Sequence, residues 1–318
     1  MDDLGYLLPE NLPQQLLSSG NDGGYPGIFG YSPSNDVETI RETITERTIG
    51  DYYLDQQLGK GYFGEVWKAK KLILGQDETV ALKIINVNQE TIENVQREVE
   101  ILKRISEPRC QPFLVCYRSS QYLKDQNRFL IEMDLVVGKN LERFIKETPE
   151  NLRAKYLLLI VKDIVTALQY LHSNEISHND IKPDNILITP TLKPVLVDFG
   201  VSCFSISLCF DKIKCCYGIK GPNLYVSPET IKTNAYYPQS DMWSLGVTCY
   251  HVITGSYPFD VPIENVKVLF DNIVKQPLKK LSTHDRTLNY IVNRCLDKNL
   301  LSRIKPDEIS IILTNRFP

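Results

Sequence analysis

Strand-like and helix-like patterns occupy two consecutive parts of this 318-residue sequence. Short apolar runs bounded by glycine-bearing turns favour strands over 52–131, and one helical pattern over 89–105 interrupts them. Beyond a join at 134–138, apolar residues recur at helical spacing, most clearly over 156–172 and 243–253. A strand-rich part followed by a helix-rich part, without alternation between the two, is typical of the α+β class. The chain is therefore predicted to be an α+β protein.

The first 50 residues differ in composition from the rest of the chain. They contain seven of the 17 glycines. Such a segment loses much backbone entropy on folding and gains little from burial, so 1–50 is predicted to be a disordered N-terminal tail. Within it, 36–47 shows helical spacing, which fits a docking or regulatory segment but is better explained as part of a plain solvated tail. The folded domain is predicted to span 51–318.

The overall composition excludes several classes of protein. Apolar residues make up 42% of the chain and charged residues 24%, which excludes a coiled coil or a wholly disordered chain. Lys and Arg number 36 and Asp and Glu 39, a net charge of −3, so we expect no binding to nucleic acid. No apolar run approaches the roughly 20 residues of a membrane helix, and the acidic N-terminus does not resemble a signal peptide. We expect an intracellular protein, cytoplasmic in the first place, with the nucleus left open.

The eight cysteines show neither a Cys-x-x-Cys pair nor the Cys/His spacing of a structural zinc site. In a chain of this length they are expected to be free thiols in a reducing compartment. They are Cys110, Cys116, Cys203, Cys209, Cys215, Cys216, Cys249 and Cys295.

Three glycines, Gly59, Gly61 and Gly64, form a G-x-G-x-x-G pattern. In a dinucleotide-binding fold this pattern would open a helix, but the residues that follow, 66–70, favour a strand. The pattern therefore indicates a hairpin whose backbone lies over phosphate groups, where a Cβ atom would hold the chain away from the oxygens.

Lys83 lies within the apolar strand pattern 80–85. An ammonium group in such surroundings is costly to bury unless it meets an anion, either a phosphate or a carboxylate. The helical pattern 89–105 offers Glu98 as one candidate partner. Taken alone, Lys83 is better explained as a surface lysine at a strand edge and Glu98 as part of a solvated helix face.

Two further segments carry residues suited to phosphoryl transfer. One places Asp180, Lys182 and Asn185 between apolar flanks, and the other, 195–200, ends a strand on Asp198. Asn185 and Asp198 offer the hard oxygen ligands that Mg²⁺ prefers. Asp180 can accept a hydrogen bond from an attacking hydroxyl, and Lys182 can neutralise charge on a transferring phosphoryl group.

Together these motifs resemble those of eukaryotic-type protein kinases, and they occur in that family's order across 52–318. The resemblance implies a bilobal fold, with an antiparallel sheet and one helix in an N-terminal lobe (51–134), a hinge (134–138) and a mainly helical C-terminal lobe (139–318). It also implies that Arg303 pairs with Glu229. The later motifs are Ser227-Pro228-Glu229, Asp241-Met242-Trp243-Ser244-Leu245-Gly246-Val247, Tyr257-Pro258-Phe259 and Arg303.

The resemblance further implies ATP as substrate, Mg²⁺ as the metal and a protein with a serine or threonine hydroxyl as the partner, while the oligomeric state stays open. Asp180 would be the catalytic base, with Lys182 beside it. Lys83 would bind the α- and β-phosphates and would pair with Glu98. Asn185 and Asp198 would hold the metal. The implied nucleotide contacts are Leu58, Gly59, Lys60, Gly61, Tyr62, Phe63, Gly64, Val66, Ala81, Lys83, Met133, Asp134, Val136 and Leu187. The implied stacked spine and its anchor are Leu102, His178, Phe199 and Asp241.

Three features depart from the family's pattern. Asn179 stands where the family has an arginine that receives the phosphate of the activation segment, so we expect catalysis that does not depend on that phosphorylation. Pro222 stands where the serine/threonine branch has a hydroxyl, whereas Lys182 keeps that branch's residue. Four cysteines lie within 203–216, where a redox switch is a minor alternative to an apolar, self-packing loop.

The leading hypothesis is an active ATP- and Mg²⁺-dependent serine/threonine protein kinase. The alternative is a pseudokinase that acts as a scaffold or allosteric partner, although such proteins usually lose the residues that Lys83, Asp180 and Asp198 represent. A small-molecule kinase of related fold would lack the 227–229 segment. A P-loop NTPase is excluded, because Asn140 follows Gly138-Lys139 and no glycine stands at 133.

Overall fold

The computed structural model describes residues 47–61, 64–73, 76–88, 91–204, 223–259 and 265–317. All of them belong to one compact unit, whose first strand begins at Thr48. Apart from 47–50, the predicted tail lies outside the described residues. So do Tyr62, Phe63, Pro222 and the cysteines at positions 209, 215 and 216.

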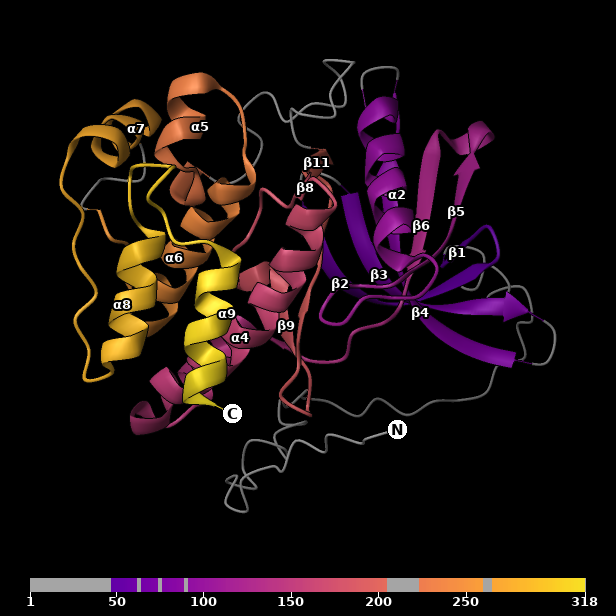
Figure 1. The fold of residues 1–318 in the computed structure, drawn as a ribbon. Coiled ribbons are helices and arrows are strands. Elements are labelled where there is room, and N and C mark those ends of the chain that lie inside the picture. The colour runs from indigo at the N-terminus through magenta and orange to yellow at the C-terminus, as the bar shows by residue number, and fades with distance from the viewer. Residues whose placement is uncertain are drawn as a thin grey trace, which may run out of the picture. The chain divides into compact units, whose positions relative to one another are not determined.

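A six-stranded antiparallel sheet and helix α2 (Ile92–Ser106) form the N-terminal part of this unit (Figure 1). The strand order is β1-β2-β3-β4-β6-β5, so the chain runs through consecutive hairpins from β1 to β4 and returns after α2 to add β5 and β6. The strands are β1 (Thr48–Ile49), β2 (Tyr52–Gly61), β3 (Gly64–Ile73), β4 (Gln76–Asn86), β5 (Tyr117–Leu123) and β6 (Arg128–Met133).

Neighbouring residues of β6 belong to different cores, because side chains alternate between the two faces of a strand. Ile131 joins the main core together with Val99 and Leu102 of α2, whereas Leu130 joins a smaller cluster with Tyr52 on the opposite face. The apolar stripe predicted for the helical pattern is therefore buried as expected. It fixes α2 on the inner face of the sheet.

Helices dominate the remainder of the unit, with α6 buried along most of its length at the centre. Figure 1 shows α8 and α9 close to α6 and α4, and helix α4 packs on α9 while α6 packs on α8. The α+β fold with a sheet lobe and a helical lobe is confirmed. The helices are α3 (Leu141–Glu147), α4 (Glu150–Ser173), α5 (Pro228–Thr233), α6 (Pro238–Thr254), α7 (Val266–Lys275), α8 (Arg286–Cys295) and α9 (Pro306–Arg316). The short strands are β7 (Lys139–Asn140), β8 (Ile176–Ser177), β9 (Ile186–Ile188), β10 (Pro194–Leu196) and β11 (Cys203–Phe204).

The implied pair between Arg303 and Glu229 is present in the helical lobe. The guanidinium contacts both carboxylate oxygens, at 2.6 and 2.8 Å, and Arg303 is 1% exposed. Its charge also lies over the ring of Trp243 on α6, 5.4 Å from the ring centre. A bidentate, charge-assisted pair of this kind is geometrically specific. It ties α5, which carries Glu229, to the chain that precedes α9.

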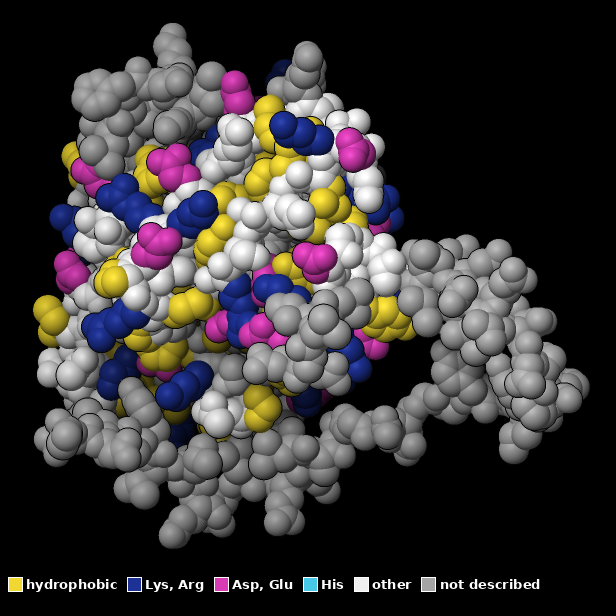
Figure 2. All heavy atoms as spheres, turned by 90° about the vertical axis from the view of Figure 1, so that its right-hand side faces the viewer, with side chains coloured by type: hydrophobic (Ala, Val, Ile, Leu, Met, Phe, Trp, Pro, Cys, Tyr) yellow, Lys and Arg dark blue, Asp and Glu magenta, His cyan; other side chains and the backbone are white. Residues whose placement is uncertain are grey.

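The surface near the sheet mixes charges of both signs. Figure 2 shows basic and acidic side chains interspersed on this face and no large area of one sign. This agrees with the near-neutral composition. Among the helices that the structure describes, none is both long enough and apolar enough to span a membrane.

The expectation of eight free thiols is wrong for part of the set. Cys110 and Cys116 form a disulfide, with Cα atoms 5.4 Å apart, and Cys203 is disulfide-bonded as well. Cys249 and Cys295 are free and buried. The sequence could not show the first pair, because spacing along the chain does not reveal which cysteines a fold brings together.

Candidate active site

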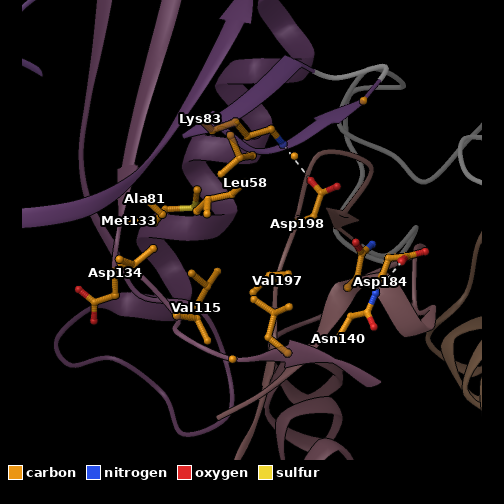
Figure 3. A pocket seen from close by; sticks show the side chains of 18 of the residues that line it. Leu58, Ala81, Lys83, Val115, Met133, Asp134, Asn140, Asp184, Val197 and Asp198 are labelled. Atoms are coloured by element: carbon orange, nitrogen blue, oxygen red, sulfur yellow. Dashed lines mark hydrogen bonds and ion pairs between the residues drawn. The ribbon is translucent and has the colours of Figure 1, made fainter. Parts of the chain in front are cut away.

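A pocket of about 680 Å³ opens beside the hinge and is lined by residues of both lobes (Figure 3). This volume is typical of a small-molecule site. Every predicted nucleotide contact that the structure describes lines it. These residues are Leu58, Gly59, Lys60, Gly61, Gly64, Val66, Ala81, Lys83, Met133, Asp134, Val136 and Leu187.

The inner part of the pocket is apolar. Ala81 of β4 pairs with Met133 of β6, so the two strands present both side chains at the same level. Figure 3 shows Ala81, Met133, Val115 and Val197 around this part of the cavity. An apolar slot beside the backbone of a connecting segment suits a flat heteroaromatic ring, because it removes apolar surface from water while leaving polar edges accessible.

The glycines of the β2–β3 hairpin differ in what surrounds them. Gly64 has φ +125°, and a Cβ there would lie 2.3 Å from the carbonyl oxygen of Ile84, so only glycine fits. At Gly59 and Gly61 a Cβ would meet no atom of the described residues within 4 Å. Open space next to two backbone-exposing residues can receive phosphate groups, so the hairpin fits a nucleotide.

Lys83 connects two elements of the site through its ammonium group. Its Nζ lies 2.6 Å from Oε1 of Glu98 on α2 and 2.9 Å from Oδ1 of Asp198, and Lys83 is 4% exposed. Burial alone would lower the pKa of Lys83, but the two carboxylates raise it above its ordinary value. The side chain is therefore a fixed cation. The alternative explanation, in which Lys83 and Glu98 are separate surface residues, is wrong, because both are buried and paired with each other.

Asp198 is held as a carboxylate. Burial would raise its pKa, but Lys83 and the backbone N–H of Gly200 outweigh burial and lower the pKa to about 2. Its backbone has φ +65°, a conformation that costs energy for a residue other than glycine. Such strain is concentrated at functional sites, where the surrounding structure imposes it.

A short hairpin places Asp198 next to Asn185. Strands β9 and β10 pair antiparallel, and the N–H of Val197 donates to the carbonyl of Asn185 at 2.9 Å. Asn185 immediately precedes β9 and Asp198 lies two residues beyond β10, so both line the same pocket. Two hard oxygen donors, supplemented by water and phosphate oxygens, are what Mg²⁺ usually receives from a protein. The residues present therefore fit this ion.

Asp180 is 4% exposed and has one oxygen fully engaged and one free. Its Oδ2 accepts hydrogen bonds from Nζ of Lys182 at 2.7 Å and from Nδ2 of Asn185 at 2.8 Å. Its Oδ1 is buried and has no hydrogen-bond partner among the described residues. A buried carboxylate oxygen without a partner is costly. The arrangement is explained if Oδ1 receives the hydroxyl of a substrate.

The loop that carries Asp180 is anchored from below by Asp241 of α6. This fully buried carboxylate accepts from the backbone N–H groups of His178 and Asn179 at 2.9 and 2.8 Å and contacts Nε2 of His172 at 2.9 Å. His178 lies against Phe199, with ring centres 4.8 Å apart. Burial lowers the pKa of His178, so its ring is neutral and can donate to the carbonyl of Val197.

Comparison with known proteins agrees with this geometry. The protein-family description "protein kinase domain" matches residues 52–311. The chain belongs to the protein kinase domain family. The members of the implied spine, Leu102, His178 and Phe199, are all buried in this kinase domain.

Several named proteins are similar to the kinase domain. Serine/threonine-protein kinase TIO of Arabidopsis thaliana is 33% identical over 73% of this chain and 16% of its own length. Serine/threonine-protein kinase ULK3 of Homo sapiens is 32% identical over 80% of this chain and 53% of its own length. Hormonally up-regulated neu tumor-associated kinase homolog of Xenopus tropicalis is 29% identical over 78% and 35%. The chain thus spans between 16% and 53% of the length of these three relatives.

Sequence reasoning missed part of the pocket lining of this kinase domain. The sequence predicted Gly138 only as the end of the hinge. A Cβ there would lie 2.4 Å from the carbonyl oxygen of Ile188, so glycine is needed where the hinge meets β9. Asn140 caps α3 by accepting from the N–H of Arg143, and its Nδ2 donates to Asp184. Capping residues are recognisable in sequence, which is the signal that could have indicated Asn140. The other lining residues that were not predicted are Val115, Lys139, Arg143, Asp184 and Val197. Leu135 lies in the predicted hinge, and Glu98, Lys182, Asn185 and Asp198 were predicted as catalytic or metal-binding residues.

Proposed function

We propose that the chain is an active protein serine/threonine kinase that transfers the γ-phosphate of ATP to a protein hydroxyl with Mg²⁺. The observation that carries the proposal is the free Oδ1 of Asp180, buried beside a complete Lys83–Glu98–Asp198 set. In this proposal the adenine lies in the apolar slot and the phosphates lie under the β2–β3 hairpin. We further propose a cytoplasmic or nuclear location.

The chemistry follows from what each residue can do. The substrate hydroxyl hydrogen-bonds to Oδ1 of Asp180, which accepts its proton as the oxygen attacks the γ-phosphorus. The bond between the γ-phosphorus and the β–γ bridging oxygen breaks, and ADP leaves. Lys182 lies 2.7 Å from Asp180 and can neutralise charge on the transferring group, while Lys83 orients the phosphates. Asn185 and Asp198 would hold Mg²⁺, which supplies further positive charge at the phosphate oxygens.

The hydroxyl preference and the active state are the finer parts of the proposal. Lys182 and the names of the relatives support serine and threonine as acceptors. The presence of four functional groups and their mutual geometry argue against a pseudokinase. These groups belong to Lys83, Asp180, Asn185 and Asp198. A binding scaffold would not require a buried carboxylate oxygen to be kept without a partner.

The test is transfer of γ-phosphate from Mg-ATP to the chain itself and to generic basic proteins, followed by phosphoamino-acid analysis. We expect Asp180→Asn to lower transfer by about 10² to 10⁴-fold while leaving nucleotide binding in place. Asp271→Asn, a matched change on the exposed face of α7, should leave transfer unchanged. Nucleotide binding without transfer by the wild-type chain would favour the pseudokinase. Phosphotyrosine as the main product would overturn the acceptor assignment.

A further inference from the structure

The disulfide between Cys110 and Cys116 closes the segment that joins α2 to β5. The two Cα atoms lie 5.4 Å apart, within the range that a disulfide spans. Cys110 is exposed and Cys116 is half-buried. The pair therefore lies at the surface, unlike the buried Cys249 and Cys295.

The residues between the two cysteines contact the strand that leads to Asp198. The N–H of Val115 donates to the carbonyl of Leu196 at 3.1 Å, and the N–H of Leu196 donates to the carbonyl of Phe113 at 2.8 Å. Leu196 is the last residue of β10, two positions before Asp198. Val115 itself lines the nucleotide pocket. We therefore expect a change in the conformation of this segment to move part of the pocket wall.

The same segment is bonded to the hinge and to α2. The carbonyl of Cys116 accepts from the N–H of Asp134 at 2.9 Å, and the N–H of Tyr117 donates to Oγ of Ser106 at 2.8 Å. Asp134 lines the pocket, and Ser106 is the last residue of α2, the helix that carries Glu98. The disulfide thus closes a short loop from which hydrogen bonds reach the hinge, the helix of Glu98 and the strand before Asp198.

We propose that Cys110 and Cys116 form a reversible dithiol–disulfide site whose oxidation tightens nucleotide binding in this kinase domain. The coupling to nucleotide rests on the proposed function, whereas the redox chemistry does not. Oxidation by a disulfide or peroxide oxidant removes one hydrogen from each thiol and forms the S–S bond, and the oxidant takes up both electrons and both protons. In the reverse direction a thiolate of a dithiol reductant attacks the sulfur of the exposed Cys110, forms a mixed disulfide with it and releases Cys116 as a thiolate. The second thiolate of the reductant then attacks the mixed disulfide, releases Cys110 as a thiolate and leaves the reductant as a disulfide.

Accessibility and the constraint on the loop support this assignment. A thiol or thiolate in solution can reach the sulfur of an exposed cysteine, whereas burial raises the pKa of both Cys249 and Cys295 and keeps them unreactive. Closing the loop removes conformations that it would otherwise sample, so the hinge and the wall at Val115 are pre-organised for a ligand. Pre-organisation of a binding wall raises affinity without adding any contact to the ligand.

The redox chemistry can be tested on the full chain without any assay of catalysis. Trypsin releases residues 110–118 as one peptide that contains both cysteines, because Arg109 and Arg118 flank it and no Lys or Arg lies between. After incubation in glutathione buffers of graded redox state and alkylation, this peptide should change from a doubly alkylated form to an unalkylated form two hydrogens lighter than the dithiol. A peptide that remains doubly alkylated in every buffer, or that stays oxidised in excess dithiothreitol, would overturn the proposal.

The coupling is tested by titrating ATP with the oxidised and the reduced chain, using calorimetry. We expect reduction to weaken binding by about fivefold or more, the lower end of ordinary coupling between sites. Cys110→Ser and the double variant Cys110→Ser/Cys116→Ser should bind like the reduced chain in both conditions. These variants control for Cys203, since a redox response that persists in them would come from elsewhere and overturn the coupling. If neither redox state binds ATP, the proposed function and the coupling fail together, while the peptide titration still decides the redox site.

Discussion

The side-chain amide of Asn179 donates a 3.1 Å hydrogen bond to the carbonyl oxygen of Val201, across 22 residues of chain. The same amide lies 2.8 Å from the sulfur of Cys203, and Asn179 is only 6% exposed. Its backbone has φ +67°, which asparagine tolerates better than most residues. The loop that carries Asp180 is therefore joined to the chain at Val201 and Cys203 by a neutral amide, at the position where the family's pattern has an arginine.

We predict that kinase activity survives complete dephosphorylation of the chain. A neutral amide gains little from a phosphate, and the hydrogen bond to Val201 already holds the segment without one. The measurement compares initial rates before and after phosphatase treatment, with phosphate loss verified by mass spectrometry. Loss of activity on dephosphorylation, traced to the removal of a phosphate from residues 201–220, would contradict the prediction.

Replacing Lys83 by Met should abolish phosphoryl transfer and also destabilise the fold. Glu98 is buried, and the substitution leaves its carboxylate and that of Asp198 without their cation. Breaking a buried ion pair by removing one partner costs about 3 kcal/mol or more of unfolding free energy. Urea unfolding of the variant measures this cost.

The double variant Lys83→Met/Glu98→Gln is the control for that mechanism. It removes the buried charge as well as its partner, so it should recover part of the lost stability without recovering transfer. A double variant no more stable than Lys83→Met would show that the cost arises from packing and not from the unpaired charge.

The stabilising effect of Asp198 should vanish in acid. Its pKa is about 2 in the folded chain and near 4 in the unfolded chain, so its ionised form contributes stability above about pH 4 and loses it as the pH falls through about 2. The unfolding free energies of wild type and Asp198→Asn should therefore differ most near neutral pH and converge below about pH 4. Urea unfolding at several pH values checks this, and a difference independent of pH would refute it.

Arg303→Met should lower the unfolding free energy by about 3 to 5 kcal/mol, because it leaves the carboxylate of Glu229 buried without its cation. Ser240 still donates to Glu229 at 2.9 Å but carries no charge. In a double-mutant cycle, adding Glu229→Gln should restore part of the loss. Strict additivity of the two changes would show that the pair does not interact energetically.

The sequence predicted most of the site, because its residues lie in short segments whose spacing carries chemical meaning. Lys83 on β4 and Glu98 on α2 are joined by a salt bridge, as expected from the resemblance. The structure adds a hydrogen bond between Asp180 and Asn185, which had not been predicted. The burial of Leu102 agrees with the helical pattern predicted over 89–105 and with the resemblance. Local spacing is informative wherever a single strand, helix or loop sets the geometry.

Contacts that no sequence motif marks were out of reach. The pairing of Cys110 with Cys116 depends on how the loop after α2 folds back, and Val115 reaches the pocket because Leu196 pairs with it from another lobe. Neither relation leaves a periodic or spaced signal. That Oδ1 of Asp180 lacks a hydrogen-bond partner among the described residues is likewise a property of the packed structure. It depends on which groups the fold brings near this oxygen and not on the residue type.

Substitution by alanine should lower the stability of the fold at one glycine of the β2–β3 hairpin and leave it unchanged at another. Gly64 has φ +125°, and a Cβ there would collide with the carbonyl of Ile84 at 2.3 Å, so Gly64→Ala should lower the unfolding free energy by about 1 to 3 kcal/mol. A Cβ at Gly59 would meet nothing within 4 Å in the part of the chain that the structure describes, so Gly59→Ala should leave the unfolding free energy within about 0.5 kcal/mol of wild type. Its methyl group would instead occupy the space proposed for phosphates. Gly59→Ala should therefore weaken ATP binding in calorimetry while unfolding in urea like wild type, and unchanged affinity would mean that the phosphates do not lie beneath this hairpin.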